Sequence, residues 1–293
     1  MNEASKKFKT KSSQKRNKII ANTSIYVILT IISIVWLLPF IYLVIQSLRG
    51  EPGALTNYLF PKEWTFRNYI LLFSDTTKFN FGRWYLNTFI IAAVTCVIQT
   101  ALTLCVSYAF SRLRFNGKKL YMKSILILGM FPGFLGMIAS YQILKLIGLN
   151  QSIFSLILIY CGSSAMGYYI SKGYFDTIPY SLDEAAKIDG ASGNTIFFRV
   201  ILPLAKPIVI YMLLMSFTSP WGDFMFASYL ANGNPDNFNV AVGLKEFLMR
   251  ENAYEYFTRF CAGAVVVSIP ITILFFWLQR YYVEGITGGS VKG

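Results

Sequence analysis

The sequence contains no histidine, few charged residues and only four cysteines, and each shortage excludes a class of protein. Charged residues make up 14% of the chain, which is too little to cover the surface of a soluble domain of 293 residues. Without histidine, and with the cysteines in no paired spacing, the sequence has none of the ligand sets typical of zinc or haem sites. We therefore expect no metal site, no cofactor held by this chain and no disulfide framework.

The most prominent feature of the sequence is a set of long segments without a charged residue. They cover residues 19–48, 84–111, 124–144, 150–171, 207–222 and 260–279. Roughly 20 residues of helix cross a bilayer core, so each segment except 207–222 is long enough alone, and that one suffices when it is extended through Asp223. The segments are continuous rather than alternating, which disfavours a barrel of strands. The sequence thus predicts an all-α polytopic membrane protein with six transmembrane helices.

The basic residues predict the orientation of these helices. The chain has 27 Lys and Arg against 14 Asp and Glu, a net charge of +13, and basic residues concentrate in 1–18 and 112–123. Lys and Arg favour the cytoplasmic side of a membrane, so both segments and both termini are expected there. We expect this charge to attract anionic lipid and not nucleic acid. The first apolar segment is too long for a signal peptide and lacks a small-x-small cleavage site, so we expect it to remain as a span.

Charge and hydropathy divide the chain into three parts. A basic cytoplasmic tail covers residues 1–18, a six-span membrane domain covers 19–280, and a cytoplasmic C-terminal tail covers 281–293. A structured loop at about 179–207 lies between the fourth and fifth spans. The expected location is the cytoplasmic membrane, with several spans in the lipid bilayer.

This loop has the residue pattern of two short helices. Ser181 and Glu184 have the spacing of a capping box, which predicts a helix that starts directly after Ser181. Gly190 suits the position just past the end of that helix, and a second helix is expected from about Thr195 until Pro203. Helices this short are marginal in water, so packing against the spans or against another protein must hold them. We expect a cytoplasmic helix-turn-helix that fits a groove in a partner.

The spacing in this loop resembles the EAA loop of bacterial ABC importer permeases. That pattern is Glu-Ala-Ala, three residues, Gly, nine residues, an Ile-type residue, one residue and Leu-Pro, and the single departure here is Val200 in place of Ile. In that family the loop is seated in a cleft of the ATPase subunit. The resemblance therefore implies that the ATPase docks on Glu184, Ala185, Ala186, Asp189, Gly190, Leu202 and Pro203.

Three further segments resemble carbohydrate permeases of the maltose/maltodextrin G subunit type. Asn87-Thr88 opens the second span as in sugar permeases, and residues 220–224 resemble a Trp-Asn-Glu/Asp-Phe pattern, with Gly222 in place of the usual Asn. The glycine-rich residues 283–293 are similar to a tail that reaches between the two ATPase subunits. That similarity implies that an extended tail contacts the ATPase through Thr287, Gly288, Gly289 and Lys292.

The resemblance implies a transport function that depends on partners. This chain would be a permease subunit working with a second homologous permease, two ATP-binding-cassette ATPase subunits and an extracytoplasmic solute-binding protein. It would move a sugar inward by alternating access, and maltose or maltodextrin is the expected sugar. Another oligosaccharide or a non-sugar solute is the alternative substrate.

The substrate path is harder to predict from one chain. Asp223 is the only ionised side chain expected within a span, so it is either functional or a hydrogen-bonded structural group near the outer end. Trp221 and Phe224 can stack on a sugar ring, and we take all three as candidates for the path. Gln99, like other neutral polar residues in the spans, can bind hydroxyl groups or tie helices together.

An enzyme is the alternative from another class. A membrane-embedded enzyme needs facing acids, a histidine or a metal set, and the predicted spans offer only Asp223. The sequence also lacks a phosphate-binding loop of the form Gly-x4-Gly-Lys-Ser/Thr, so ATP must be hydrolysed by a separate subunit. A channel or scaffold would not need the helix-turn-helix loop. We therefore expect no catalytic residue in this chain.

Overall fold

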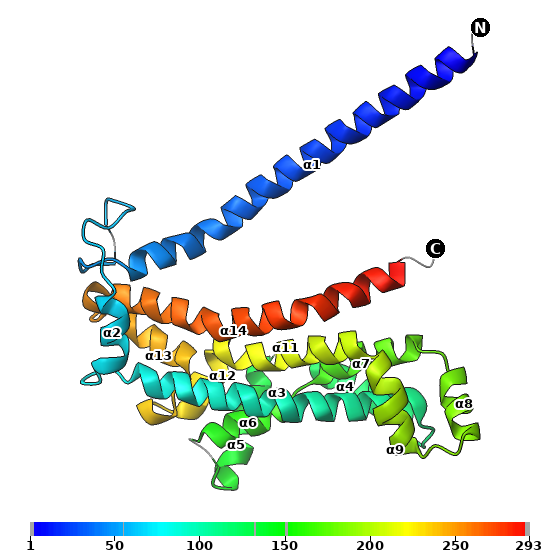
Figure 1. The fold of residues 1–293 in the computed structure, drawn as a ribbon. Coiled ribbons are helices and arrows are strands. Elements are labelled where there is room, and N and C mark those ends of the chain that lie inside the picture. Colours follow the sequence, from blue (N-terminus) through cyan, green and yellow to red (C-terminus); the bar gives the residue numbers. More distant parts are fainter. Residues whose placement is uncertain (1–2, 55, 132, 150–151, 291–293) are drawn as a thin grey trace.

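The computed structural model describes residues 3–54, 56–131, 133–149 and 152–290, which form a bundle of helices (Figure 1). These residues contain no strand, only an isolated antiparallel bridge between Arg49 and Trp64. The first elements are α1 (Glu3–Ser47), α2 (Arg67–Ser74), α3 (Phe81–Arg112), α4 (Lys118–Gly129), α5 (Gly133–Leu146), α6 (Ile153–Gly162), α7 (Ala165–Thr177) and α8 (Ser181–Ile188). They are followed by α9 (Gly193–Thr195), the π-helix η1 (Ile196–Ile201), α10 (Leu202–Leu204), α11 (Lys206–Gly222), α12 (Met225–Ala231), the 3-10 helix η2 (Pro235–Asn237), α13 (Val240–Phe247) and α14 (Ala253–Ser290).

Polar caps set where several of these helices begin. The Asn80 side chain accepts a hydrogen bond from the Arg83 amide at the start of α3, 3.1 Å away. Ser152 and Asn239 accept equivalent bonds at the starts of α6 and α13. Each cap satisfies an amide that has no partner inside its helix, which matters where water is scarce.

Three segments are long and apolar enough to cross a membrane alone, namely Lys18–Ser47, Phe81–Arg112 and Ala253–Tyr281. Two bent pairs raise the number to five if each pair is one span. One pair joins Ile153–Gly162 to Ala165–Thr177 with a bend of 41°, and the other joins Gly193–Leu204 to Lys206–Gly222 with a bend of 84°. The structure thus has several membrane spans in the regions where the sequence predicts them.

The predicted span at 124–144 is divided between two helices. The chain leaves α4 after Gly129 and enters α5 at Gly133. These helices have 12 and 14 residues, so each falls short of a bilayer core at about 1.5 Å per residue. Glycine and proline at 129–133 disfavour a continuous helix, which explains where the division falls.

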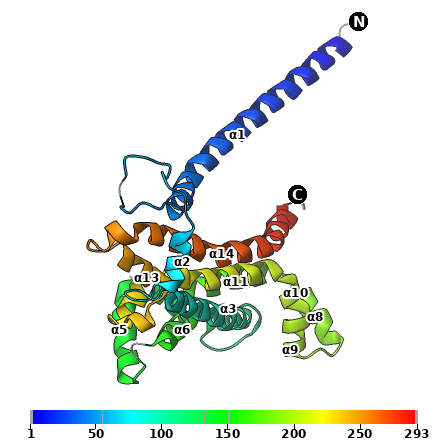
Figure 2. The ribbon, with the colours of Figure 1, turned by 60° about the vertical axis from the view of Figure 1, so that its left-hand side comes forward.

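Helix α1 projects away from the other helices and packs mainly against α14 (Figures 1 and 2). None of its most apolar window is buried within the chain. Among the remaining helices, α3 packs mainly against α6, α7 and α11, and α14 packs against α11. Helices α8 and α9 lie at one end of this bundle, near the end of α14, whereas α2 and α13 lie at the other (Figure 1).

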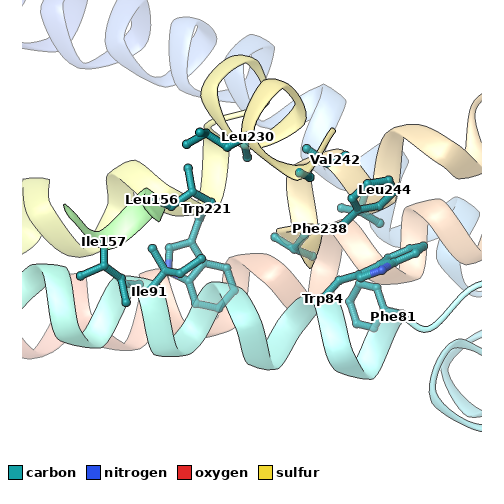
Figure 3. Packing of buried hydrophobic residues seen from close by; sticks show 14 of the residues in the cluster. Phe81, Trp84, Ile91, Leu156, Ile157, Trp221, Leu230, Phe238, Val242 and Leu244 are labelled. Carbon is teal, nitrogen blue, oxygen red and sulfur yellow. The ribbon is translucent and has the colours of Figure 1, made fainter. Parts of the chain in front are cut away.

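An aromatic core holds α3 to the segment that follows α11 (Figure 3). Phe81 and Trp84 of α3 pack beside Leu244 of α13, and all three side chains are buried. Gly243 makes this approach possible, because a Cβ there would lie 2.0 Å from Cε3 of Trp84. The Trp84 indole donates to the carbonyl of Pro235, 3.0 Å away.

Asn87 and Thr88 add polar ties to the same junction. The Asn87 amide donates to the carbonyls of Asp236 and Phe238 at 2.8 and 3.0 Å. The Thr88 hydroxyl accepts from the Val240 amide at 2.7 Å, at the start of α13. These two residues therefore fix the loop between α12 and α13 onto α3.

Candidate functional site

Helix α8 is the centre of the predicted docking loop, and its two ends differ in how well the sequence predicts them. The helix begins at Ser181, and the structure gives no side-chain cap there. The capping-box prediction was therefore wrong, because the Glu184 amide donates to the backbone carbonyl of Tyr180, 3.1 Å away. At the other end Gly190 has φ +79°, and its amide donates to the Lys187 carbonyl. The prediction that Gly190 follows the helix end is confirmed.

The second helical segment starts at a serine cap and continues to a sharp bend. The Ser192 hydroxyl accepts from the Thr195 amide at 3.3 Å, and α9, η1 and α10 then follow without interruption. The predicted stop at Pro203 was wrong by one residue, since α10 ends at Leu204. Pro203 lies in the last turn of this continuous segment, directly after the wider turns of η1.

Five of the seven predicted docking residues are exposed on this loop. Glu184, Ala185, Asp189, Gly190 and Pro203 are exposed, whereas Ala186 and Leu202 are partly buried. Both of these inward residues pack against the second hydrophobic cluster, which comprises Leu104, Phe175, Ile178, Ile196, Phe197, Ile201, Ala205, Ile208 and Met212. The loop thus rests on an apolar base, and its exposed side carries the polar Glu184 and Asp189 together with apolar side chains such as Ile188, which is 87% exposed. Helices α8 to α10 project from one end of the bundle (Figure 2).

A buried ion pair fixes α8 to the end of α3. Nε of Arg112 lies 3.3 Å from Oδ2 of Asp183, and the two side chains are 3% and 7% exposed. These two atoms are close enough for an ion pair but are not aligned for a hydrogen bond, and neither has a hydrogen-bond partner. Arg112 also donates through Nη2 to the Ile178 carbonyl at 2.7 Å and stacks 4.2 Å from the centroid of the Tyr180 ring.

Neighbouring polar groups extend this connection. The Tyr180 hydroxyl donates to the Ser111 carbonyl at 2.8 Å, and the Ser111 hydroxyl donates to Asp176 of α7 at 2.7 Å. The ends of α3 and α7 and the start of α8 are therefore held as one unit. Sequence reasoning missed Arg112 and Asp183, which it treated only as orientation charge and as part of the loop.

The three candidates for the substrate path occupy different settings. Trp221 is buried, and its ring packs against Tyr85 and Phe217. Asp223 accepts hydrogen bonds from the Tyr160 hydroxyl of α6 and from the Phe226 amide of α12, the latter at 3.1 Å. Phe224 is partly buried and lies 4.9 Å below the ammonium group of Lys245. The carboxylate of Asp223 thus joins α6 to the start of α12.

The break between α6 and α7 borders two cavities. One, of about 320 Å³, is lined by α3, the break and α11. The other, of about 740 Å³, lies towards α4 and α5. Ser163, Ala165 and Met166 line both cavities, and none of the three path candidates lines either.

The predicted tail contacts fall at the end of α14. This helix continues to Ser290, so the backbone of Thr287, Gly288 and Gly289 is helical where an extended chain was expected. Lys292 lies outside the described residues.

Comparison with known proteins now places the chain in a family. Residues 105–288 match the model of the binding-protein-dependent transport system inner membrane component family. The chain belongs to this family. It is 35% identical to the galactooligosaccharides transport system permease protein GanQ of Bacillus subtilis (strain 168), over 92% of this chain and 94% of the relative. It is 36% identical to the maltodextrin transport system permease protein MdxG of the same strain, over 92% of this chain and 95% of that relative.

A solved structure has the same fold. One chain of a bacterial ABC transporter involved in the import of the acidic polysaccharide alginate matches with a TM-score of 0.74 and 25% identity. The match covers 91% of this chain and 98% of that one. Membership of this transport family makes the chain a membrane permease subunit and not an enzyme, as the loop pattern predicted.

Proposed function

We propose that this chain moves a neutral oligosaccharide, with maltodextrin as the first candidate, into the cell through an ABC importer driven by a separate ATPase. The observation that carries this proposal is that one face of α8 is exposed while Asp183 ties the helix to α3. Glu184, Ala185 and Asp189 face outward, and the Arg112–Asp183 pair ties their helix to α3. A force applied to α8 is therefore transmitted to a membrane span.

We infer six spans, with α4 and α5 together forming the third. Both termini and the docking loop are then cytoplasmic, which agrees with the basic residues at 1–18 and 112–123. The arrangement of helices supports this, because α8 lies at the end of the bundle where α14 finishes (Figure 1). In this division the membrane domain is 19–280, and the tails are 1–18 and 281–293.

The partners that we propose each have a surface on the chain. Two ATPase subunits bind ATP and serve the assembly, one of them docking on α8. A second homologous permease shares the membrane path and covers part of the exposed apolar surface of α1, whose most apolar window is 0% buried. An extracytoplasmic solute-binding protein meets the end that carries α2 and α13. We propose that the tail after residue 281 also contacts the ATPase.

Two relatives guide the proposed substrate. Their names specify galactooligosaccharides and maltodextrin, which are both neutral. Their identities to this chain are nearly equal, so galactooligosaccharide is the second candidate. Both candidates place hydroxyl groups, not charge, in the transport path.

Reconstitution tests this proposal. The complex of this chain with its second permease and ATPase is placed in proteoliposomes with ATP inside and sugar-loaded binding protein outside. We expect ATP-dependent accumulation of maltodextrin, with galactooligosaccharide and an amino acid as competitors. Failure to accumulate any sugar in a complex that hydrolyses ATP would contradict the proposed function.

A further inference from the structure

The span formed by α6 and α7 is broken at Ser163 and Ser164, between Gly162 and Ala165. Its two halves meet at a bend of 41°. Non-helical backbone at membrane depth is stable only where protein surrounds it or where it lines a polar cavity. Such breaks also lie at substrate sites in several transporter folds, because they expose backbone groups near the middle of the membrane.

The lining of the smaller cavity at this break is uncharged and mixes polar with apolar groups. Its volume of about 320 Å³ lies within the range of about 300–1,000 Å³ that is usual for small-molecule sites. The lining residues with polar side chains are Gln99 of α3, Ser163 and Ser164 of the break, and Tyr211, Ser216 and Ser219 of α11. Methionine and alanine side chains supply most of the apolar lining, and none of the lining residues is ionisable at neutral pH.

Some of these polar side chains form hydrogen bonds within the described part of the chain, and others do not. The Ser164 hydroxyl accepts from Thr103 at 3.1 Å, and the Ser216 hydroxyl accepts from Thr100 at 3.4 Å. In the described part of the chain, the side chains of Gln99, Ser163 and Ser219 make no hydrogen bond. All three are partly or fully exposed at the cavity. Uncommitted polar groups within a span are costly unless they face water or a ligand.

The larger cavity adds an apolar surface next to these groups. It shares Ser163, Ala165 and Met166 with the smaller one and is otherwise lined mainly by apolar residues of α4 to α7. A pyranose ring has hydroxyl groups around its edge and a less polar C–H face. The junction of the two cavities matches this division, because amide and hydroxyl groups line the smaller cavity and apolar side chains such as Ile143 and Leu158 line the larger one.

We propose that this junction binds one neutral pyranose unit of the transported oligosaccharide, with Gln99, Ser163 and Ser219 as hydrogen-bond partners. The proposal rests on the proposed function, and it assigns the sugar contacts to a different place from Trp221, Asp223 and Phe224. It also specifies the class of sugar. Without a cation in its lining, the junction offers nothing to neutralise the carboxylate of a uronate, so acidic sugars are excluded.

The test compares two cavity variants with one control in the reconstituted importer. Gln99→Leu and Ser219→Ala each remove a hydrogen-bonding group at the cavity. The control, Gln142→Leu, is the same Gln-to-Leu substitution at an exposed residue of α5 that lines neither cavity. We expect sugar uptake per ATP hydrolysed to fall by about tenfold in Gln99→Leu and by severalfold in Ser219→Ala. Gln142→Leu should behave as wild type. ATP hydrolysis stimulated by the loaded binding protein should persist in all three, because the ATPase and the binding protein act at other surfaces.

The outcomes separate this inference from the proposed function. Wild-type uptake per ATP in both cavity variants overturns the inference and leaves the proposed function intact. Absence of sugar uptake by the wild-type complex overturns both. If Gln99→Leu fails to assemble, Ser219→Ala decides alone, since removing one exposed hydroxyl leaves the packing of α11 unchanged.

Discussion

Arg112 at the end of α3 and Asp183 in α8 form an ion pair that is almost completely buried, with 3.3 Å between Nε and Oδ2. Taking two charges out of water is costly, and removing one partner of such a pair costs about 3–5 kcal/mol because the other charge remains buried. Arg112 also binds the Ile178 carbonyl and stacks on Tyr180, so it contacts the chain on both sides of the turn before α8. Helix α8 is therefore attached to the end of α3.

The first prediction concerns this pair. Asp183→Asn keeps the shape of the side chain but leaves the Arg112 charge uncompensated, so we expect ATP-driven uptake to fall by about tenfold or more. Arg112→Lys keeps the charge but loses the second N–H that reaches Ile178, so we expect an intermediate loss. Lys172→Gln is the control, because its i,i+4 pair with Asp176 is partly exposed and contributes little. Wild-type uptake in Asp183→Asn would show that the pair has no part in coupling.

The second prediction tests the backbone at Gly190. Its φ of +79° costs an ordinary L residue about 1–2 kcal/mol, although nothing lies within 4 Å of an added Cβ. We expect Gly190→Val to lower uptake severalfold and Gly190→Asn to retain most of it, since Asn tolerates this conformation. Gly193→Ala is the control, as that position is equally open but has no positive φ. Equal uptake by Gly190→Val and Gly193→Ala would contradict the conformational explanation.

The third prediction tests the aromatic core. In Gly243→Ala the new Cβ would lie 2.0 Å from the Trp84 ring, and overpacking of this kind costs about 1–3 kcal/mol. We expect the midpoint of thermal unfolding in detergent to fall by several degrees. Gly222→Ala, which has nothing within 4 Å of its Cβ, should unfold close to the wild-type temperature. A Gly243→Ala variant as stable as Gly222→Ala would mean that α13 and α3 can separate without cost.

The fourth prediction concerns Asp223, which links α6 to α12 by accepting from Tyr160 and from the Phe226 amide. If its role is structural, Asp223→Ala and Tyr160→Phe should both lower the thermal midpoint, and their effects should not add in the double variant. Sugar uptake per ATP should stay near wild type in the fraction that assembles. Loss of uptake in well-assembled Asp223→Ala with an unchanged midpoint would instead give Asp223 a direct role in transport.

Local residue patterns predicted the parts of the fold that depend on neighbouring residues in the chain. Gly190 was placed correctly because the left-handed conformation after a helix favours glycine wherever that helix packs. The cap at Ser181 was predicted wrongly, because the turn at Ile178 and Tyr180 is fixed by Arg112 of another helix. The pairing of Arg112 with Asp183 depends on how α3 meets α8, which one sequence does not specify.

The candidate site divides in the same way. Spacing in the loop identified the exposed face of α8, since a motif of adjacent residues is visible in sequence. The polar junction at Ser163 was not predicted, because Gln99, Ser163 and Ser219 belong to three segments that come together only in the folded chain. The sequence singled out Gln99 as able either to bind hydroxyl groups or to tie helices together, and the serine pair resembles the small polar residues common in membrane helices.

The most direct test of ATPase docking on α8 is a cross-link between α8 and the ATPase in a transport-active complex. Cys105 is the one exposed cysteine among the four, so Cys105→Ser provides the background for Ala185→Cys on the outer face of α8. Asp236→Cys serves as the control at the opposite end of the bundle. If α8 docks on the ATPase, a short thiol–amine cross-linker joins Ala185→Cys to the ATPase and leaves Asp236→Cys unlinked. Transport-active complexes in which Ala185→Cys never cross-links to the ATPase would contradict it.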